Sequence, residues 1–376
     1  MSSLATAGEK RIWLVIGDKP GDNAQVEIIA EALGLPFEVR RVLPKEQFVL
    51  GKPSFDASLY HLDLDRSDKL EPPWPDFILT IGRRPSMAAL WIQEQSGGRT
   101  RIILLGRPKK WIERFELVIV PSQYQLPERS NVLNFDLPLM RSNEAAIAEA
   151  VKHWQEAFDG LDKPVTALLV GGQTKPFRFD KAAAQELLDK TSTVLSQSPG
   201  TLYITTSRRT PPGVVNTLRE QLPAYAILYE WDPDNRADNP YLALLGLADQ
   251  FIVTGDSISM MVEVARRGKP LAIFELPYQK DLATRLRRLL TEVGRIEAGA
   301  AGSGKVFPRL MALLQKIRLA GYPRDLTAIH ALLYQQKLAV PLGNPFLRGG
   351  PRAVDELAQV VERIRRIVLQ GQRGVQ

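Results

Sequence analysis

One stretch of the chain decides its fold: Gln250–Glu275, with the sequence QFIVTGDSISMMVEVARRGKPLAIFE. It predicts a strand over Phe251–Thr254, a polar loop, a helix over Ile258–Arg267 and a second strand over Leu271–Phe274. Both strands are short apolar runs, and a glycine and a proline follow the helix, as is typical of helix ends. A strand, a helix and a second strand in this order predict a βαβ unit.

The loop of this βαβ unit carries small polar side chains at the start of a helix. A helix N-terminus has unpaired N–H groups and a partial positive charge, so Asp256 and Ser257 lie where a phosphate would bind. Glu263 follows Ser257 by six residues and can reach back toward the loop, where a ribose would lie. Together with Ser259 and Met260 in the first turn, these residues form one half of a predicted nucleotide site.

Length and composition set the class of protein. The 376 residues suit two α/β domains, and 44% hydrophobic with 24% charged residues is typical of a soluble globular protein. The longest apolar runs have the length of strands, and the apolar run near the N-terminus is too short for a signal peptide, so we expect a cytoplasmic protein. There are no cysteines, and the three histidines lack a zinc-binding spacing. We therefore expect no metal and no cofactor.

The net charge of +7 suggests anionic partners. The basic residues are dispersed and lack interleaved aromatic residues, so we do not expect nucleic acid. A solvated basic surface, anionic lipid headgroups and phosphate-bearing substrates remain open. A basic helix over Leu282–Leu290 could place the protein on the inner membrane, and an ordinary solvated helix face is the alternative.

Strands and helices alternate along both halves, which predicts two doubly wound parallel sheets covered on both faces. We expect a first domain over residues 1–158, a second over 159–345 and a long C-terminal helix within 346–376. The expected strands include Ile12–Ile16, Phe37–Val42, Phe77–Ile81, Ile102–Leu105, Leu117–Val120, Ala167–Val170, Tyr203–Thr206 and Ala226–Tyr229. The expected helices include Ala24–Leu33, Ser86–Gln95, Asn143–Phe158, Val214–Gln221 and Ala353–Leu369. Ligands of such sheets bind at the carboxyl ends of strands.

The loop after the first strand, GDKPGDN, is the most distinctive one. Asp22 or Asn23 would cap the following helix. Asp18 lies too early to cap it, so it is the first candidate for a general base, with Asp22 second. The spacing fits neither the P-loop nor the dinucleotide fingerprint. The other candidate binding residues of this loop are Gly17, Lys19, Gly21 and Asn23.

Arginines follow two other strands of the first half. Arg83 and Arg107 come directly after a strand and a glycine, and Arg84 follows Arg83. At such a place a guanidinium can hold a carboxylate or a phosphate with two hydrogen bonds. Exposed arginine without a ligand is an equally ordinary interpretation.

Two loops of the second half complete the predicted nucleotide site. Gly171 and Gly172 would leave bare backbone beside the donors Thr174 and Lys175. A second loop presents Ser207, Arg208 and Arg209 at the end of a strand. Hydroxyls and guanidiniums of this kind would hold a phosphate or a diphosphate.

Five motifs in order carry a family resemblance over residues 11–280. GDKPGDNAQ, GGQTKPFRFD, TTSRRTP, NPYLALLGLAD and TGDSISMMVEVARRGKP resemble the Elm-one family of bacterial proteins, which is named after a plant mitochondrial-fission factor. Members are described as glycosyltransferases of the GT-B type, whereas the plant factor is regarded as a recruiting protein. The resemblance implies two Rossmann-like domains that face a cleft, with a nucleotide sugar bound by the second domain and an acceptor by the first.

The activity that this resemblance implies is metal-independent glycosyl transfer. A base, Asp18 or Asp22, would deprotonate the hydroxyl of a glycan or lipid-linked acceptor, while cationic groups stabilise the departing phosphate. In that family Ser257 would serve the phosphates and Glu263 the ribose, and the last helix would return to the first domain. A non-catalytic recruitment protein and a nucleotide-sugar epimerase or hydrolase remain alternatives.

Overall fold

The structure is a computed structural model that describes residues 10–370, except 50, 52, 125, 127, 140–142, 236–237, 281–324, 352 and 355. The described residues form two compact units: residues up to 139 and from 356 onward make up unit 1, and residues 143–354 make up unit 2. The basic helix expected over Leu282–Leu290 lies outside the described residues. None of the helices in the described part of the chain combines the length and apolar sequence that a bilayer span requires.

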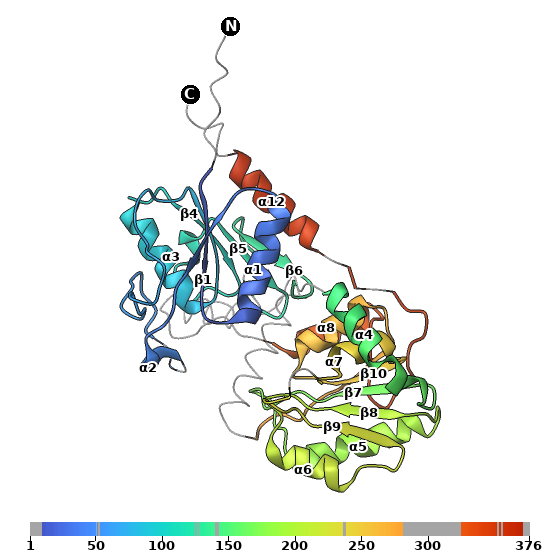
Figure 1. The fold of residues 1–376 in the computed structure, drawn as a ribbon. Helices are drawn as coiled ribbons and strands as arrows, with labels where there is room; N and C mark the ends of the chain where they lie inside the picture. Colours follow the sequence, from blue (N-terminus) through green and yellow to red (C-terminus); the bar gives the residue numbers. More distant parts are fainter. Residues whose placement is uncertain are drawn as a thin grey trace, which may run out of the picture. The chain divides into compact units, whose positions relative to one another are not determined.

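Unit 1 is built on a six-stranded parallel sheet with the strand order β2-β1-β3-β4-β5-β6 (Figure 1). Its strands are β1 (Ile12–Ile16), β2 (Glu38–Arg41), β3 (Phe77–Ile81), β4 (Arg101–Leu105), β5 (Leu117–Pro121) and β6 (Val132–Phe135). Its helices are α1 (Pro20–Leu33), α2 (Glu46–Val49), α3 (Arg83–Gln95), the 3₁₀ helix η1 (Ile112–Arg114) and α12 (Leu357–Gln370).

Both faces of this sheet are buried, which explains why its central strands are continuous apolar runs. Successive side chains of a strand point to opposite faces. Leu14 and Ile16 of β1 belong to the core under α1, whereas Trp13 and Val15 belong to the core under α3. The sheet is therefore doubly wound, as expected from the sequence.

The helix α12 completes the first of these cores. Val360, Ile364 and Val368 are almost fully buried in it. The Arg365 guanidinium donates to the Leu33 carbonyl at the end of α1, at 2.9 Å. Figure 1 shows α12 beside α1 although the two helices lie at opposite ends of the chain.

Unit 2 repeats the architecture, with a second six-stranded parallel sheet in the order β12-β11-β10-β7-β8-β9. Its strands are β7 (Thr166–Leu169), β8 (Leu202–Thr205), β9 (Ala226–Tyr229), β10 (Gln250–Thr254), β11 (Leu271–Phe274) and β12 (Val340–Pro341). Its helices are α4 (Glu144–Asp159), α5 (Lys181–Leu195), α6 (Pro212–Glu220), α7 (Tyr241–Leu247), α8 (Ile258–Arg266) and α11 (Thr327–Gln335). The predicted βαβ unit is thus present as β10, α8 and β11, with bounds within one residue.

The domain boundary expected at residue 158 lies too late in the chain, because α4 belongs to unit 2. One face of α4 packs there: Phe158 is buried and stacks on Tyr203 of β8, with ring centroids 5.4 Å apart. Gly246 of α7 has no room for a Cβ, which would lie 2.3 Å from a methyl group of Val151. The helix therefore joins the sheet that follows it in sequence.

Two helices of unit 1 begin earlier than expected. α1 begins at Pro20, which occupies the first helical position, where its fixed φ and missing N–H are tolerated. α3 begins at Arg83, directly after Gly82, which has a φ of 83°. Asp22 and Asn23 consequently lie inside α1 and do not cap it, and Arg83 and Arg84 are helical residues.

Candidate functional site

The candidate loops of unit 2 meet where the strand order of the sheet reverses. From β7 the chain proceeds outward through β8 and β9, then returns to place β10 on the other side of β7. The loops that follow β7, β8 and β10 therefore lie together at the carboxyl edge. In open parallel sheets this reversal is where ligands bind.

Asp256 joins two of these loops from a buried position. Its carboxylate accepts hydrogen bonds from the Gly172 amide and the Thr254 hydroxyl, both at 2.8 Å. Burial raises the pKa of this carboxyl, and the hydrogen bonds from Gly172 and Thr254 oppose that shift. Asp256 thus holds the loop after β7, which is a different task from the ligand contact expected from the sequence.

The backbone of the Gly171–Gly172 loop is not bare, in contrast to the expectation. The Gly171 amide donates to Thr254 Oγ1 at 2.8 Å, and the Gly172 amide is held by Asp256. Both glycines are needed for close packing. A Cβ on Gly171 would lie 2.0 Å from Ser257 Oγ, and one on Gly172 would lie 2.3 Å from Arg209 Cβ. Neither amide is available to a phosphate in this arrangement.

The loop after β8 is tied to the same edge by a hydroxyl. Thr210 Oγ1 donates to the Gly171 carbonyl at 2.6 Å and accepts from the Ser207 amide at 2.8 Å. Arg209 donates to Thr174 Oγ1 at 3.1 Å, so Thr174 and Arg209 hold one another. The Arg209 guanidinium also lies 3.9 Å from the Asp256 carboxylate.

Arg208 differs from its neighbour Arg209. Its side chain is exposed, lines a pocket and has no hydrogen-bond or ion-pair partner among the described residues. Lys175, also expected at the donor site, is exposed and precedes a cis peptide bond to Pro176. Of the predicted cations of unit 2, Arg208 is therefore the one positioned to meet a ligand in this pocket.

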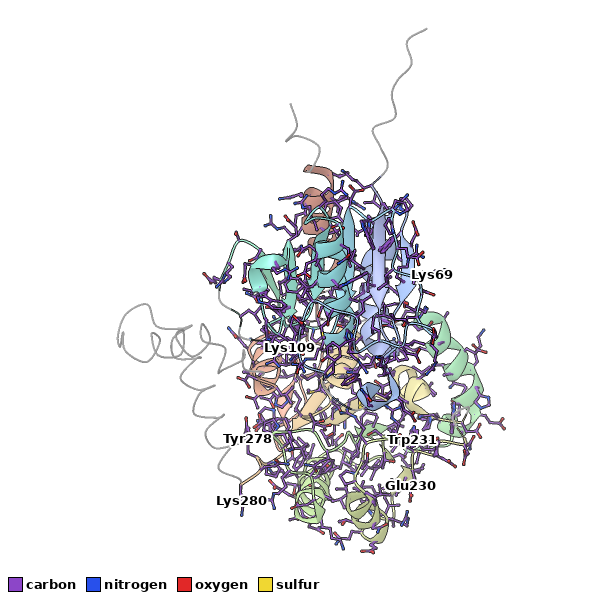
Figure 2. The ribbon with its side chains drawn as sticks, turned by 90° about the vertical axis from the view of Figure 1, so that its left-hand side faces the viewer. Lys69, Lys109, Glu230, Trp231, Tyr278 and Lys280 are labelled. Carbon is purple, nitrogen blue, oxygen red and sulfur yellow. The ribbon has the colours of Figure 1, made fainter. Side chains whose placement is uncertain are left out.

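This pocket has a volume of about 720 Å³ and is formed entirely by unit 2. The loop after β8 supplies one wall, and α4 supplies another. Trp231, labelled in Figure 2, follows β9 and adds an indole ring. Its backbone amide donates to Thr206 Oγ1 at 2.8 Å. The lining includes Thr206, Ser207, Arg208, Trp231, Tyr241 and Met260.

The remaining candidate residues of the βαβ unit lie at the start of α8. Its N-cap residue, Ser257, makes no side-chain capping bond, so the first amides of the helix are not satisfied in that way. Ser259 is exposed and Met260 lines the pocket. The start of α8 therefore lies at the pocket, as the nucleotide prediction requires.

Glu263 lies one turn further along α8 and is bonded to Tyr241. The Tyr241 hydroxyl donates to Glu263 Oε2. Burial raises the pKa of the Glu263 carboxyl, and the hydrogen bond from Tyr241 opposes the shift. Burial, followed by the Glu263 charge, raises the pKa of Tyr241 well above 10.0, so its hydroxyl stays protonated.

In unit 1 the candidate residues also meet where the strand order reverses, between β1 and β3. The Asp18 carboxylate accepts from the Arg84 guanidinium at 2.7 Å, and the same guanidinium donates to the Phe48 carbonyl at 2.6 Å. Arg83 donates to the Pro53 carbonyl at 2.8 Å. The two arginines, expected as acceptor clamps, thus hold the segment that contains α2.

Of the other residues in the GDKPGDN sequence, some are buried and some are exposed to solvent. The buried Asn23 donates from its amide to the Gly17 carbonyl at 2.9 Å, which closes the loop on itself. Lys19 and Gly21 are exposed, and Asp22 is half-buried in the first turn of α1. An acidic side chain in that turn is favourable for the helix dipole.

Arg107, the third predicted clamp, lies over the ring of Tyr124, with its guanidinium carbon 5.7 Å from the ring centroid. Within the described residues, no group of three His, Asp or Glu side chains lies close enough to hold a metal ion.

Sequence reasoning missed the aromatic residues of the pocket. Tyr241 lies in the NPYLALLGLAD motif, two residues after Asn239, and its backbone amide donates to the Asn239 side chain at 2.9 Å. No sequence motif marks Trp231 or His153 as a pocket residue. His153 lies on α4, and its place at the pocket depends on which sheet that helix packs against.

Comparison with known proteins identifies the family. Residues 20–308 match the model of the family described as Mitochondrial fission ELM1. The chain belongs to this family. Among the relatives of this chain, Uncharacterized protein RP120 of Rickettsia prowazekii (strain Madrid E) is 26% identical over 299 residues, which cover 71% of this chain and 83% of that protein.

The match to the plant member of the ELM1 family covers a smaller share of that protein. Mitochondrial fission protein ELM1 of Arabidopsis thaliana is 25% identical over 250 residues, which cover 61% of this chain and 58% of that protein. The chain therefore spans little more than half of that relative.

Solved structures with a similar chain path have low sequence identity. UDP-GlcNAc 2-epimerase from Methanocaldococcus jannaschii has a TM-score of 0.49 at 9% identity, covering 96% of this chain and 100% of that chain. Arabidopsis thaliana UGT89C1 complexed with UDP-L-rhamnose has a TM-score of 0.45 at 11% identity, covering 97% and 94%.

Proposed function

We propose that unit 2 binds a nucleotide sugar and that the protein transfers its sugar to a hydroxyl acceptor. The observation that carries this proposal is the 720 Å³ pocket at the carboxyl edge of the sheet. One wall offers Ser207 and Arg208 to phosphates, and another offers Trp231 to a planar base. Pockets of this size are of the kind that hold nucleotide-sized ligands.

The groups around the pocket suit a reaction in which a nucleotide phosphate departs. Negative charge then develops on the leaving oxygen, and fixed donors near it lower the barrier. Arg208 and the first amides of α8 supply such donors. The sugar would pass to a hydroxyl of a glycan or lipid-linked acceptor, on an anionic membrane surface or in solution. Asp18 remains the proposed base, with Asp22 second.

A second candidate function is recruitment without catalysis. The observation that favours it is the ion pair of Asp18 with Arg84, which occupies the carboxylate that transfer would need. A nucleotide bound in unit 2 would then serve as a signal for assembly. An epimerase or hydrolase that uses the donor alone is a third outcome of the experiment below.

The first experiment measures nucleotide binding by thermal denaturation and calorimetry. UDP, GDP and ADP sugars are tested with wild-type protein, because specific binding to the native state raises the midpoint. Arg208→Ala should weaken binding by about tenfold or more, as expected when a charged hydrogen bond is lost. Lys152→Ala, which removes an exposed cation from α4, is the control and should leave affinity unchanged.

The second experiment separates the three functions. A transferase leaves the donor intact until an acceptor is added, whereas an epimerase or hydrolase converts the donor alone. A recruitment protein binds the donor and converts it in neither condition. Failure of every nucleotide to bind wild-type protein would overturn the proposal as a whole.

A further inference from the structure

The structure shows which residue of the Tyr241–Glu263 pair lies at the pocket, and the sequence alone does not. Tyr241 begins α7 and lines the pocket, together with Met260 of α8. Glu263 lies on the same helix as Met260 but is absent from the described residues that line this pocket. The Tyr241 hydroxyl points to Glu263 and donates to it. Of this pair, Tyr241 is therefore the residue at the pocket wall, and the Glu263 carboxylate lies behind it.

The chemistry of the pair gives the phenol oxygen a defined role. An ionised carboxylate can only accept hydrogen bonds, whereas a phenol can donate one and accept others. Because the Tyr241 hydroxyl donates its proton to Glu263, the lone pairs of the phenol oxygen are left to accept a hydrogen bond from another group. A hydrogen bond to a charged acceptor also strengthens the next bond in a chain. The phenol oxygen is thus prepared to accept from a hydroxyl group of a ligand.

The surroundings of Glu263 favour this pairing over direct contact with a ligand. Met261, Val262 and Val264 beside it are fully buried, so α8 packs around its base. Tyr241 is the hydrogen-bond partner of the carboxylate in the described part of the chain. Removing this donor would leave a half-buried carboxylate without its hydrogen bond, which is unfavourable although the Arg266 cation also acts on it. The pair is therefore maintained before any ligand binds.

We propose that Tyr241 accepts a hydrogen bond from a ribose hydroxyl of the bound nucleotide and that Glu263 is a positioning residue acting through Tyr241. This inference rests on the proposed nucleotide binding. It changes the role expected for Glu263, which the sequence placed in direct contact with ribose. It also defines the ligand class: a ribonucleotide is preferred to its deoxy counterpart.

The test measures affinities of UDP, GDP and ADP, and of their 2′-deoxy and 3′-deoxy counterparts, by calorimetry. For the best ribonucleotide, wild-type protein should lose about tenfold in affinity when the accepted hydroxyl is removed. Tyr241→Phe should weaken the ribonucleotide to the level of its deoxy counterpart, because the phenyl ring cannot accept. The ratio between the two ligands should fall to about one. A purely structural role of Tyr241 would weaken both ligands equally.

Glu263 is tested by the same ratio. Glu263→Gln keeps an oxygen for the phenol and should reduce the preference for ribose without abolishing it. The double variant Tyr241→Phe/Glu263→Gln should bind no more weakly than Tyr241→Phe, because Glu263 acts through Tyr241. Tyr229→Phe is the matched control, since its hydroxyl bonds to the Asn235 carbonyl, and it should preserve the ratio.

Four results would overturn the inference. If Tyr241→Phe binds ribonucleotides more tightly while Glu263→Gln loses the preference, Glu263 meets ribose directly and Tyr241 only covers it. If Tyr241→Phe does not fold, an unchanged ribose preference in Glu263→Gln overturns the inference. Wild-type protein that binds nucleotides equally with and without ribose hydroxyls overturns it while leaving the proposed function intact. Absence of all nucleotide binding overturns both.

Discussion

The Arg84 guanidinium bridges the Asp18 carboxylate and the Phe48 carbonyl, at 2.7 and 2.6 Å. The side chain of Arg84 is 11% exposed and that of Asp18 is 27% exposed. A half-buried cation thus joins the loop after β1 to the segment that contains α2. The residue predicted to be the base of a transfer reaction is also a structural partner, and the two roles can be separated by substitution.

Substitutions at this pair should affect stability unequally. Arg84→Ala leaves two acceptors without their donor, so we expect a loss of about 1–3 kcal/mol in the free energy of unfolding. Asp18→Asn keeps an acceptor oxygen and should cost less than about 1 kcal/mol. Urea denaturation followed by circular dichroism measures both. Arg66→Ala, at a 69% exposed side chain, is the control and should be nearly neutral.

Activity separates the two roles of Asp18. If Asp18 is the base, Asp18→Asn should abolish transfer while donor affinity stays at the wild-type level. Transfer that survives in a folded Asp18→Asn protein eliminates Asp18 and makes Asp22 the residue to test next.

Gly171 should tolerate no side chain. A Cβ there would lie 2.0 Å from Ser257 Oγ and 2.5 Å from Asp256 Oδ1, inside a buried hydrogen-bonded loop. Gly171→Ala should therefore lower the free energy of unfolding by about 1–3 kcal/mol. Gly160→Ala is the control, because no atom lies within 4 Å of its added Cβ and its φ is −84°. Equal thermal midpoints for the two variants would contradict the packing described here.

His61 should make unit 1 sensitive to acid. Burial lowers the pKa of its imidazole from 6.5 to about 4, while its hydrogen bond to the Arg84 carbonyl opposes the shift. A folded-state pKa below the unfolded one contributes stability that is present above pH 6.5 and is lost as the pH falls through 4. The linkage corresponds to about 3 kcal/mol. His61→Gln should flatten this part of the stability–pH curve; an unchanged curve would show that other groups govern it.

Two residues of α12 allow a matched comparison. Ile364 is fully buried against the sheet of unit 1, whereas Leu369 is 49% exposed. Ile364→Ala should cost about 2–5 kcal/mol in the free energy of unfolding, including the cavity left behind. Leu369→Ala should stay within about 0.5 kcal/mol. Similar denaturation midpoints for the two variants would mean that α12 contributes little to the core.

The sequence predicted what short-range patterns determine. Apolar runs and punctuating glycines located β10, α8 and β11 within one residue. It could not show that Asp256 reaches the Gly172 amide, because these residues are 84 positions apart and meet only through the β7–β10 pairing. The same limit explains Arg84: a strand-end arginine has the same local pattern whether its partner is a ligand or the Asp18 carboxylate.

The place of α12 in the sequence has a consequence for synthesis. A chain grows from its N-terminus, so all of unit 2 is synthesised before Val360 and Ile364 are added. During that interval the apolar face of the unit 1 sheet beside α1 lacks its last cover, and exposed surface of this kind promotes aggregation. Folding of unit 1 is therefore complete only after α12 has been translated.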